Sequence, residues 1–202
     1  MTATVPLVIE ARFRPHPKMG SSNDGEEIMK LTELLLAGLE REAAFTRTAL
    51  QRIPEGHNDW KPHPTSVALG YLASLIATLP AWIATMVNQN EVDLKSPGAA
   101  RLKAPEWTTR AELMTALDAN ISQARDALAN TTDEHLLAPW RFLVGSHVVD
   151  ESPRHVMIAD SVFSHLAHHR GQLTVYLRLR LQQDDAQVPA LCGPSADQGL
   201  VA

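Results

Sequence analysis

Apolar residues recur at three- and four-residue intervals in long stretches of the chain, the spacing of an amphipathic helix. The first stretch contains Ile28, Leu31, Leu35 and Leu39 and predicts a helix that ends near Arg52. The next stretch, residues 66–89, is apolar nearly all round. Such a pattern is typical of a helix at the centre of a bundle.

The segment from Val67 to Val87 carries no charged residue, and its length would also span a bilayer. Pro80 lies inside it, small and polar residues interrupt it, and its flanks show no Lys/Arg bias. We therefore expect a buried helix rather than a membrane span. Pro80 lacks the backbone N–H and should bend its axis.

Two further helices follow. Thr109 and Glu112 have the spacing of a capping box, which predicts a helix from there to about Asn130. Its apolar stripe comprises Leu113, Leu117, Ile121, Ala124 and Leu128. Ser152 as N-cap and Pro153 at the first helical position predict a last helix that reaches about residue 183. Four long helices joined by unequal connections predict an all-α four-helix bundle.

The connections differ in character. Residues 53–64 contain three prolines and form a loop in which Trp60 is a candidate anchor, and residues 90–106 form a second linker. Residues 139–150 have an extended pattern, consistent with a small hairpin or a wandering connection. We expect an irregular N-terminal extension over residues 1–28, in which a short strand is possible, a bundle domain over 29–197 and a C-terminal tail over 198–202.

The composition of the chain argues against several classes of function. The chain has 18 Lys+Arg against 23 Asp+Glu and no basic block, which argues against nucleic acid as a partner. Its one cysteine, Cys192, excludes an intramolecular disulfide framework and has no neighbour that would activate it as a nucleophile. The first twenty residues lack the apolar core of a secretory signal, so we expect a cytoplasmic protein. No phosphate loop or dinucleotide fingerprint occurs.

The candidate chemistry lies in the last helix. His165 and His169 are four residues apart and share one helix face, with Gln172 and Tyr176 below them, whereas His168 is rotated away. Two imidazoles can bind one ion, but a catalytic zinc site normally takes three protein ligands. A third ligand would have to come from another helix.

Several segments resemble the DinB family. Residues 165–178, HLAHHRGQLTVYLR, and 188–197, VPALCGPSAD, are similar to its closing signature. The loop 60–64, WKPHP, the segment 69–73, LGYLA, and the start 29–35, MKLTELL, support the resemblance. It implies an up-down-down-up bundle that forms homodimers and binds a divalent metal through three histidines. Relatives of this kind include transferases that use low-molecular-weight thiols and a maleylpyruvate isomerase, and many have no established activity.

The resemblance implies an incomplete metal site in this chain. Two of the family's metal histidines match His165 and His169, but the third position holds Leu75. A leucine cannot coordinate a metal, so we hypothesise that zinc or nickel binds weakly or not at all. A replacement ligand from a connection or a neighbouring helix stays open. The candidates are His63, His147, His155, Glu151 and Asp160.

We expect a cleft between the second and fourth helices. Its predicted lining is Tyr71, Leu75, Thr78, His165, His169, Gln172 and Tyr176. His168 and Arg170 are expected on a solvated or dimer-facing surface. The favoured hypothesis is a metal-free scaffold that binds a small molecule or is stress-related. The alternative is a divalent-metal-dependent enzyme, thiol S-transferase-like or hydrolase-like.

Overall fold

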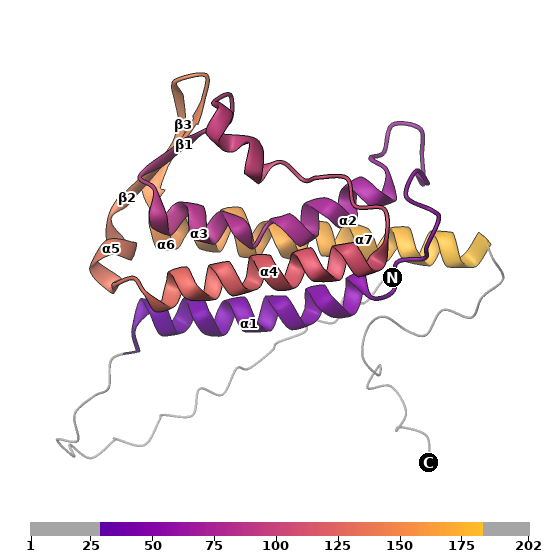
Figure 1. The fold of residues 1–202 in the computed structure, drawn as a ribbon, viewed down its shortest axis with the longest axis horizontal. Coiled ribbons are helices and arrows are strands. Elements are labelled where there is room, and N and C mark those ends of the chain that lie inside the picture. The colour runs from indigo at the N-terminus through magenta and orange to yellow at the C-terminus, as the bar shows by residue number, and fades with distance from the viewer. Residues whose placement is uncertain (1–28, 184–202) are drawn as a thin grey trace, which may run out of the picture.

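The computed structural model describes residues 29–183, as a bundle of long helices with a small sheet at one end (Figure 1). The long helices are α1 (Leu31–Leu50), α2 (Leu69–Thr78), α3 (Ala81–Asn88), α4 (Arg110–Ala129) and α7 (His165–Gln183). α4 packs against α1, α2 and α3, and α7 packs against α1 and α2. The expected extension 1–28 and the tail 198–202 lie outside the described residues.

The predicted stripe and cap of α4 are confirmed. All five predicted core residues of this helix are buried. The Thr109 hydroxyl accepts the N–H of Glu112, and the Glu112 carboxylate accepts the N–H of Thr109 at 3.0 Å. This capping box satisfies N–H groups that have no partner inside the helix.

The predicted bend at Pro80 is also confirmed, and it separates α2 from α3. The two helices meet at an angle of 40°. Ile76 and Ile83, on either side of the bend, are fully buried, so both helices contribute to the core. None of the described helices is by itself long and apolar enough to cross a membrane. The bent pair α2 and α3 together meets the length and composition of a span.

The bundle is not purely helical, so the all-α expectation is corrected. β1 (Glu91–Asp93), β2 (Pro139–Val144) and β3 (His147–Pro153) form a three-stranded sheet. β2 and β3 form the hairpin that the extended pattern allowed. Gly145 and Ser146 turn it with φ of 63° and 65°, the backbone that a two-residue hairpin turn requires.

β1 was expected to be part of a linker. It pairs in parallel with β2, and Val92 lies opposite Phe142. The Asp93 carboxylate accepts the N–H groups of Gly145 and Ser146 at 2.7 and 2.8 Å, which fixes the hairpin turn against β1. The same linker also contains a short 3₁₀ helix, Pro97–Leu102. A second short helix that the sequence did not predict, α5 (Asp133–Leu137), precedes β2.

The last predicted helix is interrupted. It comprises α6 (Arg154–Ile158), a π-helical segment (Ala159–Ser164) and then α7. It begins one residue later than predicted, because Ser152 and Pro153 still belong to β3. A π-helical turn accommodates an extra residue and is frequent at functional sites.

A buried guanidinium attaches the hairpin to the bundle. Arg154 is only 2% exposed, and its Nε donates to the Met86 carbonyl at 3.0 Å. Its Nη1 donates to the carbonyls of Ala138 and Pro139, and its Nη2 donates to Asn90 Oδ1. Burial lowers the pKa of Arg154 from its ordinary value. The end of α3 and the start of β2 are therefore joined through one side chain.

Candidate functional site

A cavity of about 520 Å³ lies where α3, the hairpin and the last helix meet. We call it the His165 cavity. Its volume falls within the range of pockets that bind small molecules. Its lining consists of Trp82, Met86, Trp140, Phe142, Asp150, Met157, Asp160, Ser161, Ser164, His165 and His168.

Aromatic rings form much of the apolar wall. Phe142 lies between Trp82 and Trp140, with ring centroids 6.1 and 6.4 Å away. Trp140 is fully buried, and its indole Nε1 has no hydrogen-bond partner among the described residues. A buried donor without a partner is rare in folded proteins, because losing its bond to water is costly.

The π-helical segment supplies the polar edge of the cavity. Asp160, Ser164 and His168 are spaced four residues apart, and all three line the cavity. Ser161 and His165 form the adjacent row. The Ser161 backbone also forms a hydrogen bond with the His165 side chain. The irregular turn therefore both presents polar groups to the cavity and orients the imidazole of His165.

His165 belongs to a chain of side-chain contacts along α7. Its Nε2 lies 2.7 Å from Nε2 of His169, and Nδ1 of His169 lies 2.7 Å from the Gln172 amide. The other amide atom of Gln172 lies 3.1 Å from Nε2 of His168. The predicted proximity of His165, His169 and Gln172 is thus present in the structure. His168, which was expected to face away, joins them through Gln172.

One arrangement of hydrogens satisfies this chain with every ring neutral. If His165 donates through Nδ1 to the Ser161 carbonyl, its Nε2 accepts the Nε2–H of His169. Nδ1 of His169 then accepts from the Gln172 amide NH₂, and the amide oxygen accepts the Nε2–H of His168. This requires the two amide atoms of Gln172 to be exchanged by rotation, which their similar shape permits.

The electrostatics favour neutral imidazole at His165. Burial lowers the pKa of its ring below the ordinary value for histidine, and the adjacent His169 lowers it further. A positive charge on His165 would lose hydration in this setting and would lie close to a second ring. His165 therefore carries little charge at neutral pH, and in the arrangement above both of its ring nitrogens are engaged by Ser161 and His169.

The donor set does not fit a divalent metal. Two imidazole nitrogens on one tetrahedral zinc lie about 3.3 Å apart, whereas His165 and His169 approach to the shorter distance of a hydrogen bond. Leu75 offers no ligand atom. Among residues 29–183, no three His, Cys, Asp or Glu side chains are grouped so that they could hold a metal ion.

Leu75 nevertheless lies at the height along α2 where a third ligand would be needed. The Tyr176 hydroxyl donates to the Val67 carbonyl, just before α2, while His165 lies on the same cavity as Trp82 of α3. α7 therefore runs antiparallel to α2 and α3. Counted along the helices, half-buried Leu75 is level with the histidine pair.

The other predicted cleft residues lie elsewhere. Tyr71 is exposed, and the buried Thr78 hydroxyl donates to the Ser74 carbonyl within α2. Tyr176 packs edge-on against Trp60, the predicted loop anchor, with ring centroids 5.9 Å apart. Of the seven predicted cleft residues, His165 is the one that lines the His165 cavity.

The possible replacement ligands are dispersed as well. Asp160 lines the His165 cavity, but Glu151 lines a separate hollow beside Arg154. The His63 ring contacts the Thr65 hydroxyl, and the His155 ring contacts the Leu136 carbonyl. His147 is exposed at the start of β3.

The expectation for Arg170 is corrected. Its Nη1 lies 2.8 Å from the Glu42 carboxylate on α1 and 3.3 Å from the Thr46 hydroxyl, and its guanidinium covers the Phe45 ring. The side chain is therefore held between α1 and α7 rather than on a solvated surface. The sequence spacing correctly predicted that Arg170 is not on the helix face of His165 and His169. It could not show that α1 packs against the face on which Arg170 lies.

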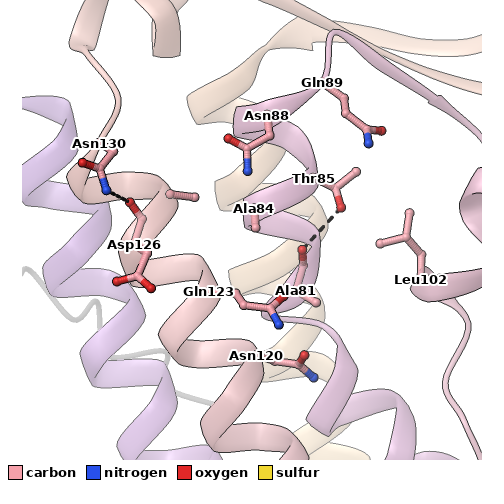
Figure 2. A pocket seen from close by; sticks show the side chains of 11 residues that line it. Ala81, Ala84, Thr85, Asn88, Gln89, Leu102, Asn120, Gln123, Asp126 and Asn130 are labelled. Atoms are coloured by element: carbon pink, nitrogen blue, oxygen red, sulfur yellow. Dashed lines mark hydrogen bonds between the residues drawn. The ribbon is translucent and has the colours of Figure 1, made fainter.

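A second hollow lies between α3 and α4 (Figure 2). Its volume is about 660 Å³, and amide side chains from both helices surround it. The amides belong to Asn88, Gln89, Asn120, Gln123 and Asn130. Among the described residues that line it, Asp126 is the single ionisable one, and none is a histidine or an aromatic residue of the kind that lines the His165 cavity.

The crystal structures that resemble this chain include those of two DinB-like proteins. A DinB-like protein of Bacillus subtilis, YjoA, matches with a TM-score of 0.57 at 18% identity, over 78% of this chain and 97% of its own length. A DinB-like protein of Bacillus cereus matches with a TM-score of 0.56 at 22% identity, over 77% and 93%. No protein-family model and no curated protein matches the chain. At these identities the similarity shows the fold.

Proposed function

We propose that this chain, which has the fold of DinB-like proteins, binds a small molecule in the His165 cavity. The observation that carries the proposal is the cavity itself, with aromatic and methionine walls and a polar edge on one side. This combination of apolar area with a few placed polar groups is characteristic of ligand sites.

Two features of the lining support the proposal. The unpartnered Trp140 indole N–H is a donor that an oxygen atom or the face of an aromatic ring on a ligand would satisfy. The π-helical segment costs helix stability, and it places Asp160 and Ser164 on the cavity edge. The first feature is more costly in an empty cavity than in one that contains a ligand, and the second supplies polar groups for that ligand.

The test uses phenethyl alcohol, a small neutral aromatic probe. We expect a saturable change in the indole N–H resonances of Trp82 and Trp140 as the probe is titrated, observed by NMR. The indole resonances of Trp60 and Trp107, which do not line the cavity, should change little. No saturable change at Trp82 or Trp140 up to the solubility limit of the probe would refute the proposal.

A cavity-filling variant gives the specificity control. Ser164 is exposed at the cavity edge, so Ser164→Phe should fill part of the cavity and abolish probe binding while the fold persists. Ser122→Phe makes the same change at an exposed position of α4 that lines neither hollow. It should bind the probe as the unmodified chain does. Equal binding by both variants would place the probe outside the cavity.

The histidine pair favours a second candidate, a divalent-metal-dependent enzyme with thiol S-transferase-like or hydrolase-like activity. In such an enzyme a metal would supply Lewis acidity to a bound thiol or water. His165 and His169 alone would have to hold it, and their geometry suits a mutual hydrogen bond. This candidate therefore ranks below the binding function.

A further inference from the structure

The His165 cavity has a negative lining. Asp150 and Asp160 are its formally charged residues, and no lysine or arginine is among the described residues that line it. The remaining ionisable groups are the imidazoles of His165 and His168.

Neither carboxylate is neutralised by another group. Within the described part of the chain, Asp150 and Asp160 form no ion pair, and the Ser152 hydroxyl donates to Asp150 at 3.3 Å. By contrast, Glu40 is paired with Arg125, and Glu42 with Arg170. The two cavity carboxylates are thus available to a ligand.

The carboxylates come from separate elements. Asp150 lies on β3 directly opposite Phe142 of β2, and Asp160 lies in the π-helical segment. A ligand inside the cavity would therefore meet negative charge from the sheet and from the helix. The fold brings the two charges to one cavity although local sequence spacing does not require it.

The aromatic wall also favours a positively charged ligand. The face of an aromatic ring is electron-rich and attracts a cation, most strongly for tryptophan. Trp82, Trp140 and Phe142 line the cavity together with the methionines Met86 and Met157. These surfaces also provide apolar contact for a hydrocarbon or aromatic body.

We infer that the ligand of the His165 cavity is an organic cation, an ammonium group carried on an apolar or aromatic body. The inference rests on the proposed binding function and adds the chemical class of the ligand. The ammonium group lies between Asp150 and Asp160, and the apolar body lies against the aromatic wall. A bare metal ion fits less well, because no three described His, Cys, Asp or Glu side chains form a metal-binding group.

The experiment compares three probes with one phenethyl body and different charges. They are phenethylammonium, neutral phenethyl alcohol and the anion hydrocinnamate. Affinities are measured at neutral pH and low salt from the Trp82 and Trp140 indole resonances. We expect phenethylammonium to bind tightest and hydrocinnamate weakest. High salt should narrow the difference, because it screens the attraction of partly exposed charges.

Variants assign the preference to the two carboxylates. Asp150→Asn and Asp160→Asn should each weaken phenethylammonium binding about two- to five-fold, and phenethyl alcohol binding should be unchanged. Asp126→Asn removes the same charge at the hollow between α3 and α4 and should leave all three affinities unchanged. Thermal unfolding of each variant checks that the fold is retained.

The outcomes separate this inference from the proposed function. If phenethyl alcohol binds in the cavity and the ammonium probe binds no tighter, the inference is overturned and the binding function stands. If Asp126→Asn weakens the ammonium probe as much as Asp160→Asn does, the preference reflects net charge alone, which also overturns the inference. If none of the probes binds in the cavity, the proposed function fails, and the inference fails with it.

Discussion

Glu42 on α1 and Arg170 on α7 form an ion pair that is largely withdrawn from water. The two atoms, Oε2 and Nη1, are 2.8 Å apart, and the side chains are 9% and 17% exposed. Replacing Arg170 leaves the poorly hydrated Glu42 carboxylate with only a 3.5 Å contact from Nε of the exposed Arg41. We expect Arg170→Met to lower the free energy of unfolding by about 2 to 3 kcal/mol, measured by urea denaturation.

An exposed ion pair between α1 and α4 provides the control. Glu40 and Arg125 are 2.7 Å apart, but both side chains are about half exposed. Glu40→Gln should cost less than about 1 kcal/mol. The double variant Glu42→Leu with Arg170→Met should recover much of the loss, since no buried charge is left unpaired. A loss in Arg170→Met no larger than that in Glu40→Gln would contradict the structural importance of the buried pair.

Asp133 should make stability depend on pH. Its carboxylate accepts the N–H groups of Leu31 and Thr32 at 2.9 and 3.0 Å, so a residue of α5 caps α1. Hydrogen bonds from Thr32 and then Leu31 lower the pKa of Asp133 below its ordinary value. The stabilisation is therefore complete above the unfolded-state pKa, about 3.9, and is lost as the pH falls through the lower folded-state value.

Asp133→Asn removes this charge. We expect a lower urea midpoint than the unmodified chain at pH 7, and a difference that shrinks as both proteins are acidified below about pH 4. Glu134→Gln, at the next position of α5, provides the control for a general effect of charge near the helix N-terminus. A difference that persists undiminished in acid would show that the carboxylate charge is not its cause.

Metal uptake should respond to the residue at position 75. We expect the unmodified chain to take up less than one zinc or nickel ion per chain. Leu75→His adds an imidazole level with His165 and His169 and should bring uptake to about one ion, measured by elemental analysis after titration. Stoichiometric, tight zinc in the unmodified chain would contradict our account of the site and revive the metal-dependent enzyme.

A histidine placed at a different position of α2 tests whether metal uptake depends on the position of the third imidazole. Tyr71→His places an imidazole one helical turn earlier on α2 and should give no comparable gain. Adding His165→Ala to Leu75→His should abolish the gain. If Leu75→His takes up no metal, the histidine pair itself has lost the ability to bind, and Leu75 alone does not explain the loss.

We expect the chain to form a homodimer, as the resemblance to the DinB family implies. Phe45 on α1 and Val175 on α7 are about half exposed, and small residues such as Ala167 and Gly171 line the groove between these helices. Light scattering over a range of concentrations should give twice the chain mass. Val175→Glu should lower the dimer fraction, whereas Val149→Glu on β3 should not. A monomer at every concentration would refute the expectation.

The features predicted from sequence are those that local pattern determines. The α4 stripe, its capping box and the bend at Pro80 each depend on residues within a few turns of one helix. The contact between His165 and His169 follows from four-residue spacing in the same way. These predictions need no knowledge of which helix lies next to which.

The features that were missed depend on long-range contacts. β1 is only three residues long, and its strand partner comes about 50 residues later in the chain. Trp82 and Asp150 reach the His165 cavity only after α3 and the hairpin have packed against the last helix. Hydrophobic periodicity does not show which distant segments pack together. The π-helical turn also has no distinct sequence pattern. The cavity therefore had to be found in the structure.

The π-helical segment before α7 has a consequence for how this cavity can diverge among related chains. A π-helical turn absorbs one extra residue, so loss of one residue from Ala159–Ser164 would restore a regular α-helix and leave α6 and α7 in place on either side. Arg154 would still hold the hairpin, and His165 would still line the cavity, whereas the side chains within the turn, including Asp160, would be repositioned. A single-codon deletion would thus alter the helical carboxylate of the recognition surface and leave the aromatic wall and Asp150 in place.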